Sequence, residues 1–179
     1  RQLDPRSYGM TIKNRKTLRE FEDPHVVQAL LTLPERIWQR HNWKSDCLIQ
    51  SAAVELQVAL AVELLVAAPV RCKNLVATEI GKNLIEVGSG IGKTLHLYYP
   101  QEDVKNDMPL EFALRGPTAS LVDRYIKFVR PQLLRAQSFF VFPGEGPSHK
   151  GGALLSEQVA DLVEREVGVR MQRGLNRQG

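Results

Sequence analysis

The chain has 179 residues, enough for one domain with a hydrophobic core, and 43% hydrophobic with 25% charged residues is ordinary for a soluble globular protein. No uninterrupted apolar run reaches the ~20 residues of a membrane span, and no basic-then-apolar leader opens the sequence. The net charge of +4 is too small to separate a nucleic-acid binder from a neutral enzyme. We therefore expect a cytoplasmic protein with no membrane partner.

The two cysteines, Cys47 and Cys72, are too few for a disulfide framework. Cys72 ends an apolar stretch, which favours a buried reduced thiol and a reducing compartment. No Cys/His spacing resembles a metal site, so we expect neither a metal nor another cofactor.

Residues 1–20 are polar and basic and predict a loose N-terminal arm, either solvated or in contact with phosphates. Asp23 followed by Pro24 predicts a helix start. Pro34 predicts the end of that helix and the start of a short one, with Ile37 and Trp38 packing inward.

Ser45 and Asp46 give a second start signal, which leads into a long apolar helix. The spacing places five apolar residues on one face: Ile49, Ala53, Leu56, Leu60 and Leu64. Its other faces are apolar as well, so this helix should be central and buried.

Three short segments, 84–87, 95–99 and 110–114, read as strands bounded by Gly, Pro, Asn or Asp, and residues 100–109 join the second to the third. A helix after Pro117 carries an apolar stripe from Leu121 to Leu133. Its basic residues lie off the stripe: Arg124, Lys127 and Arg130. The fold class this predicts is α+β, mainly helical with a small three-stranded antiparallel sheet.

The remaining segments are a brief strand-like run at 139–142 and a loop over 143–153. A final helix follows, capped by Ser156 and closed by Gly168. Residues 172–179 should form a disordered tail, which leaves 21–171 as the folded domain.

Residues 87–94, VGSGIGKT, partly match the phosphate-binding pattern G-x-x-x-x-G-K-[ST]. The first required glycine is replaced by Val87, and the segment after Lys93 alternates like a strand, whereas the motif needs a helix there. The glycines are better explained as the turn of a hairpin.

Three segments, taken together, resemble the catalytic domain of the tyrosine recombinases, the phage-integrase family. Arg71 lies in RCKNL after the apolar helix, similar to the family's R-x-S-E-L box, with Asn74 in place of the acidic residue. Lys105 lies in EDVKNDMPL before the third strand, where the family has a turn lysine. The segment from 140 to 171 is similar to the stretch before the family's H-x-x-R box.

The resemblance implies an integrase-like domain with double-stranded DNA as its partner and no small-molecule substrate. Arg71 would be the first of two arginines that stabilise the phosphate in the transition state, and Lys105 the general acid for the leaving oxygen. No histidine here has Arg three residues later, and Tyr125 lies too early to be the family's nucleophile. We expect an incomplete catalytic domain: a DNA-binding fragment of a site-specific recombinase, inactive as written.

Several alternatives remain open at this stage. Arg71 could pair with Glu79 or cap the preceding helix, and Lys105 could be an ordinary hairpin lysine. Tyr125, Trp38 and Trp43 are expected in the core or at its edge. The chain could instead be a non-catalytic interaction module that pairs with another chain, itself included, or a nucleotide-binding protein that uses Lys93.

Overall fold

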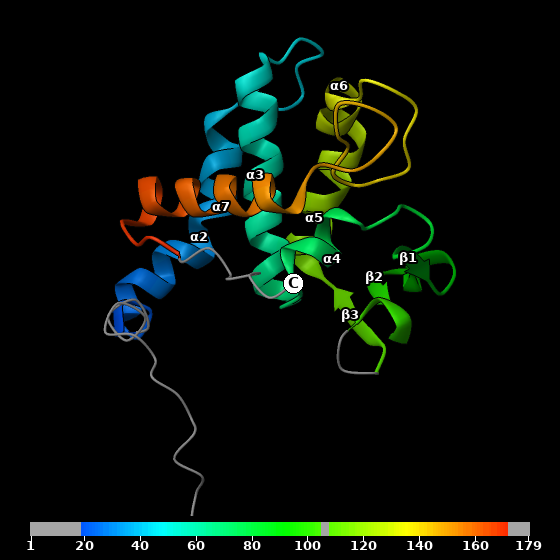
Figure 1. Ribbon diagram of the computed structural model, residues 1–179, viewed down its shortest axis with the longest axis horizontal. Helices are drawn as coiled ribbons and strands as arrows, with labels where there is room; N and C mark the ends of the chain where they lie inside the picture. Colours follow the sequence, from blue (N-terminus) through cyan, green and yellow to red (C-terminus); the bar gives the residue numbers. More distant parts are fainter. Residues whose placement is uncertain (1–18, 105–107, 172–179) are drawn as a thin grey trace, which may run out of the picture.

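The computed structural model describes residues 19–104 and 108–171, so most of the arm and the whole tail expected from the sequence lie outside the described residues. The helices are α2 (Pro24–Arg40), α3 (Gln50–Ala67), α4 (Cys72–Val76), α5 (Gly116–Arg124), α6 (Arg130–Leu133) and α7 (Gly152–Val167). The strands are β1 (Leu84–Val87), β2 (Thr94–Tyr99) and β3 (Leu110–Leu114). Short turns complete the order: η1 (Gly90–Gly92), η2 (Gln101–Asp103) and the π-helical η3 (Tyr125–Val129). The expected α+β class is confirmed, with the sheet at one side of the helices (Figure 1).

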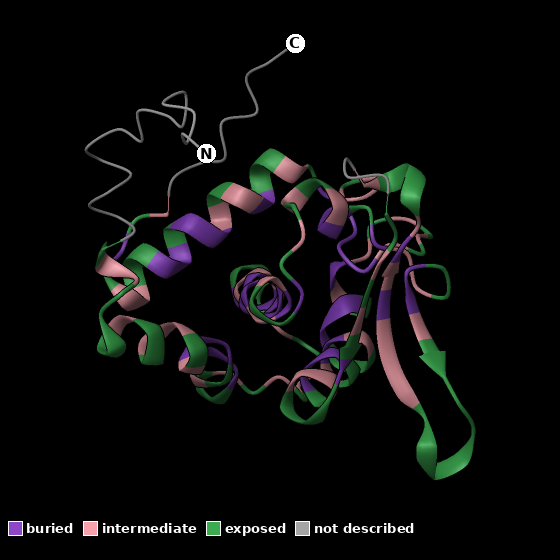
Figure 2. Ribbon diagram, turned by 90° about the horizontal axis from the view of Figure 1, so that it is seen from below, coloured by how far each residue is buried: buried purple, intermediate pink, exposed green. Residues whose placement is uncertain are grey.

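Helix α3 is the centre of the fold. It contacts α2, α5, η3, α6 and α7, and Figure 2 shows it end-on, with the other elements around it. Its buried residues lie on every side, as the lack of a polar face predicts. By length and composition α3 could also cross a membrane, but 56% of it is buried here, and core helices of soluble proteins meet the same criterion.

The predicted start of α3 was wrong. The hydroxyl of Ser45 accepts the backbone N–H of Cys47 at 3.2 Å and so closes a local turn, and the helix begins only at Gln50. Ile49 is therefore the N-cap residue and is 71% exposed, not part of the buried face.

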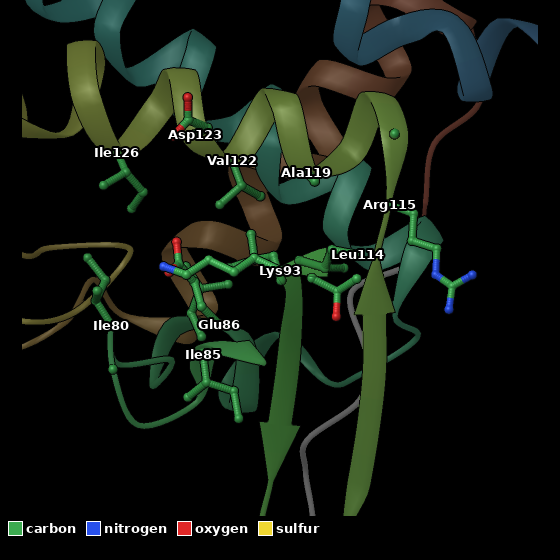
Figure 3. A pocket seen from close by; sticks show the side chains of 15 residues that line it. Ile80, Ile85, Glu86, Lys93, Leu114, Arg115, Ala119, Val122, Asp123 and Ile126 are labelled. Carbon is green, nitrogen blue, oxygen red and sulfur yellow. The ribbon is translucent and has the colours of Figure 1, made fainter. Parts of the chain in front are cut away.

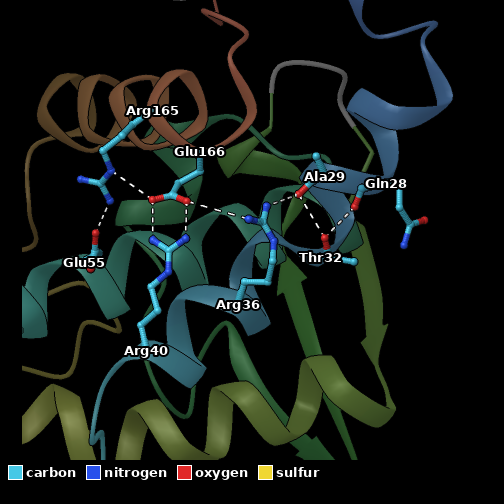
Figure 4. A network of polar contacts seen from close by, with 8 residues as sticks. All are labelled: Gln28, Ala29, Thr32, Arg36, Arg40, Glu55, Arg165 and Glu166. Carbon is cyan, nitrogen blue, oxygen red and sulfur yellow. Dashed lines mark hydrogen bonds and ion pairs between the residues drawn. The ribbon is translucent and has the colours of Figure 1, made fainter.

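Helix α2 continues through Pro34, so the predicted break there was also wrong. A proline removes one backbone donor and pushes against the preceding turn, which loosens the carbonyls one turn back. The carbonyl that loses its donor is that of Leu30, and side chains bind the two carbonyls before it: Thr32 donates to Gln28 O at 2.9 Å, and Arg36 donates to Ala29 O at 3.0 Å (Figure 4). Pro34 itself is buried against the core, which adds apolar contact.

An ion-pair network fastens α2 to α7. Arg40 binds Glu166 through two hydrogen bonds of 2.6 and 2.7 Å, and Arg165 links Glu166 to Glu55 of α3 (Figure 4). The hydrogen bonds from Arg40 lower the pKa of Glu166 to about 2. The bidentate geometry fixes the crossing of the two helices.

The sheet has the order β1-β2-β3, with both pairs antiparallel. Leu84 lies opposite Leu97, and Leu95 opposite Leu114, and this face turns toward the helices. The hairpin explanation of the glycines is confirmed, because η1 leads directly into β2. Gly88 has φ +94, and a Cβ there would lie 2.9 Å from the carbonyl oxygen of Gly92.

Helices α5 and α6 form one continuous helix through η3. The wider π-helical turn changes the helical phase, and Arg130, expected off the apolar stripe, is only 8% exposed. Its guanidinium donates to the carbonyls of Ser138 at 2.6 Å and Phe140 at 2.8 Å. These bonds hold the 139–142 segment, which forms only an isolated bridge with Glu79 and not the expected strand.

The expected core positions of Tyr125 and Trp38 are confirmed, since both side chains are fully buried. Tyr125 donates its hydroxyl proton to Val141 O at 2.7 Å and accepts from the Gln57 amide at 3.0 Å. Trp38 donates to Leu56 O at 3.2 Å. Trp43 lies at the edge, between Trp38 and Phe128.

We predict that Tyr125→Phe lowers the free energy of unfolding by about 1–3 kcal/mol, because it leaves a buried carbonyl and a buried amide without their partner. Urea unfolding followed by circular dichroism measures this change. Tyr98→Phe is the matched control, since the Tyr98 hydroxyl has no hydrogen bond within the described residues, and it should change stability by less than ~0.5 kcal/mol. Equal effects of the two variants would contradict the role of the Tyr125 hydroxyl.

Candidate functional site

The backbone of Arg71 is held by α4, while its side chain has no bonding partner among the described residues. It is the N-cap residue of α4, with φ −73 and ψ 146, and its carbonyl accepts the N–H groups of Asn74 at 2.9 Å and Leu75 at 3.0 Å. Its side chain is exposed and makes no hydrogen bond or ion pair with the described residues. Neither local alternative is observed: Glu79 pairs with Lys82 at 3.4 Å, and Arg71 does not cap α3.

Helix α4 is held in place by the start of α7. A Cβ on Gly152 would lie 3.5 Å from the Cα of Lys73, so the two helices meet almost backbone to backbone. The Cys72 thiol bonds to the Ser156 side chain, and burial raises the pKa of that thiol. Helix α7 begins at Gly152, so Ser156 lies inside the helix and contacts α4. The helix cap predicted at Ser156 was wrong.

Both cysteines are free; Cys72, expected to be buried, is half-buried, and Cys47 is exposed.

The loop before α7 contains a buried lysine, Lys150, that the sequence patterns did not indicate. Lys150 is 9% exposed, and its Nζ donates to Gln158 Oε1 at 2.8 Å and to Gln57 Oε1. Burial lowers the pKa of Lys150 to about 8. A lysine beside two glycines gives no sign of burial in sequence, because its partners come from α3 and α7.

Lys105, the other predicted catalytic residue, lies outside the described residues, so the structure does not place it relative to Arg71. The elements on either side are described: η2 ends at Asp103, and β3 begins at Leu110. Asn74 accepts the Thr78 hydroxyl through its backbone carbonyl at 3.3 Å.

Two of the three described tyrosines, Tyr99 and Tyr125, are poorly placed for nucleophilic attack, whereas Tyr98 is half-buried. Tyr99 is 2% exposed with its hydroxyl bonded to Thr78 at 2.7 Å, and Tyr125 is fully buried. Burial is the main cause that raises the pKa of both hydroxyl groups, which disfavours the phenolate. Among the described residues no group of three or more His, Cys, Asp or Glu is placed to hold a metal ion.

Chemically, the site is an exposed guanidinium on a rigid backbone, with the exposed Lys73 two residues away on α4. A guanidinium presents a planar set of donors that match two oxygens of a phosphate or carboxylate. The arrangement is suited to binding an oxyanion, and the neighbouring Cys72 is half-buried with a pKa raised by burial, which disfavours the reactive thiolate.

Comparisons with protein-family models, with curated proteins and with solved structures give no significant match. The resemblance to tyrosine recombinases therefore depends on the three sequence segments and stays a prediction.

We predict that the Lys150 amine titrates with a midpoint of about pH 8 in the folded protein. The unfolded chain keeps this proton up to about pH 10.5, so unfolding takes up a proton between these values. The free energy of unfolding should therefore rise with pH across this window. The rise should be larger in the unchanged protein than in Lys150→Met. An NMR titration of the lysine Cε resonances, assigned by that variant, measures the midpoint directly. A midpoint above about pH 10 would contradict the buried amine.

Proposed function

We propose that this chain is an integrase-like module that binds duplex DNA through Arg71 and does not transfer DNA strands on its own. The observation that carries the proposal is the state of Arg71. Its backbone is fixed by α4, while its guanidinium is exposed and has no partner among the described residues. A guanidinium without a partner is available to a phosphate, which it can bind through two parallel hydrogen bonds.

The order of elements around Arg71 supports the same proposal. A buried helix ends, a short turn follows, Arg71 begins a small helix, and a three-stranded antiparallel sheet comes next. The resemblance to tyrosine recombinases implies this order, with the lysine in the turn between the second and third strands. Lys105 falls in that turn by sequence.

Binding without strand transfer follows from the chemistry at hand. Strand transfer in the family needs a tyrosine nucleophile and a second arginine on the same phosphate. Tyr99 and Tyr125 are buried and bonded elsewhere, and the buried Arg130 binds backbone carbonyls. We therefore expect electrostatic contact with the DNA backbone without a covalent link.

The nucleotide-binding alternative loses support. Lys93 pairs with Glu86 at 2.7 Å, and β2 follows the glycines where a phosphate loop would need a helix.

We predict that duplex DNA binding weakens as salt rises, and that Arg71→Ala lowers the slope of log K against log salt by about 0.9, the value for one phosphate contact. Arg71→Ala combined with Lys105→Ala should lower it by about twice as much. Fluorescence anisotropy with a labelled duplex at several salt concentrations measures the slopes.

Arg170→Ala is the matched control, because this exposed arginine is already paired with Glu164 and lies 3.9 Å from Asp161. It should leave the slope unchanged. Binding that is independent of salt, or no binding to any duplex, would contradict the proposed function. A stable dimer without DNA affinity would favour the interaction-module alternative instead.

A further inference from the structure

A cleft of ≈ 760 Å³ lies between the sheet and the α5–η3 helix, on the side of the β1–β2 hairpin (Figure 3). Its apolar lining comes from the sheet, from the segment before β1 and from the helix: Ile80, Leu84, Leu95, Leu114, Val122 and Ile126. Leu84, Leu114 and Val122 are core residues, whereas Ile80, Leu95 and Ile126 remain partly exposed. The cleft is thus an opening into the edge of the core, and its volume lies in the ~300–1,000 Å³ range of small-molecule sites.

The charged residues that line the cleft sum to zero, but all of them except Arg115 have an ion-pair partner among the described residues. Lys93 is bound to Glu86 at 2.7 Å, and Asp123 is bound to Lys127 at 3.0 Å. Arg115, at the end of β3, is exposed and forms no ion pair or hydrogen bond with the described residues. Figure 3 shows its guanidinium extending outward from the β3 end of the cleft.

We propose that this cleft binds a small amphiphile with one apolar chain and one carboxylate group. The chain would lie between the sheet and α5–η3, where it removes the partly exposed Leu95 and Ile126 from water. The carboxylate would pair with Arg115, the free cation of the cleft, through two hydrogen bonds. A neutral or cationic amphiphile would gain the apolar contacts but not this pair.

The second cleft of the described chain has a different character. It lies between the start of α3 and α7, and its charged residues are already paired: His41 with Glu55 at 2.5 Å, and Arg165 with Glu55 and Glu166. Ile49 exposes its side chain there. This cleft offers apolar contact without a free cation and so provides an internal control for non-specific adsorption.

The test is isothermal titration calorimetry of the whole chain with octanoate, octanol and octyltrimethylammonium, each kept below its micellar concentration. We expect octanoate to bind with one site per chain and at least about tenfold more tightly than either of the other two, since a charge-assisted hydrogen bond is worth roughly that ratio. Arg115→Gln should lower octanoate affinity to that of octanol, while Arg115→Lys keeps part of it.

Ala119→Trp, which fills the cleft from α5, should abolish binding, whereas Ile49→Ala in the other cleft should change nothing. Circular dichroism checks that each variant is folded. If Ala119→Trp does not fold, the variants at the exposed Arg115 still test the proposal. Equal affinity for the three amphiphiles, loss of binding in Ile49→Ala, or no octanoate binding by the folded chain would each overturn the proposal. None of these outcomes depends on DNA binding at Arg71.

Discussion

The central position of α3, with other helices packed around it, is the constraint on which the rest of the fold depends. A helix with no polar face must be covered on every side, so α2, α5 with η3, α6 and α7 all pack against it. The single polar residue among its buried positions, Gln57, has to be satisfied inside the core. It binds the hydroxyl of Tyr125 on one side and the amine of Lys150 on the other. One side chain thus fixes both the phase of the η3 helix and the path of the loop before α7.

The candidate site follows from the same constraint. The loop that ends at Lys150 brings Gly152 against α4, and the Cys72–Ser156 contact closes that junction. Helix α4 then holds Arg71 at its first turn, while the core leaves the guanidinium outside. An oxyanion site requires a cationic side chain without a partner on a backbone that is held in place. The buried polar groups nearby bind other parts of the protein instead. The proposed DNA contact therefore uses the surface of a junction whose interior is structural.

Sequence patterns predicted the elements whose signals are local. The three strands, the buried character of α3 and the glycine at the end of α7 follow from alternation, apolar content and the left-handed φ of +83 at Gly168. The failures depend on side-chain contacts, packing or a change of helical phase, which the pattern of a segment does not show. Helix α2 continues through Pro34, whose ring is buried against the core, and the side chains of Thr32 and Arg36 bind carbonyls of the preceding turns.

The same explanation applies to the functional residues. Arg71 was proposed from the resemblance carried by RCKNL after an apolar helix, a local pattern, and the structure leaves its side chain exposed. Lys150 and Arg130 were missed because their burial is decided by Gln57, Gln158 and the carbonyls of the 138–140 segment. Arg115 gave no local signal either, since the cleft beside it forms only when the sheet meets α5.

The measurement that tests the central claim most directly is a backbone amide NMR titration of the folded chain with a short duplex. We predict chemical-shift changes centred on the amides of residues 71–73 and 151–153, where α7 meets α4. The amides of the η1 turn should change little. Changes confined to other surfaces, or none at saturating duplex, would contradict the assignment of Arg71 as the DNA contact.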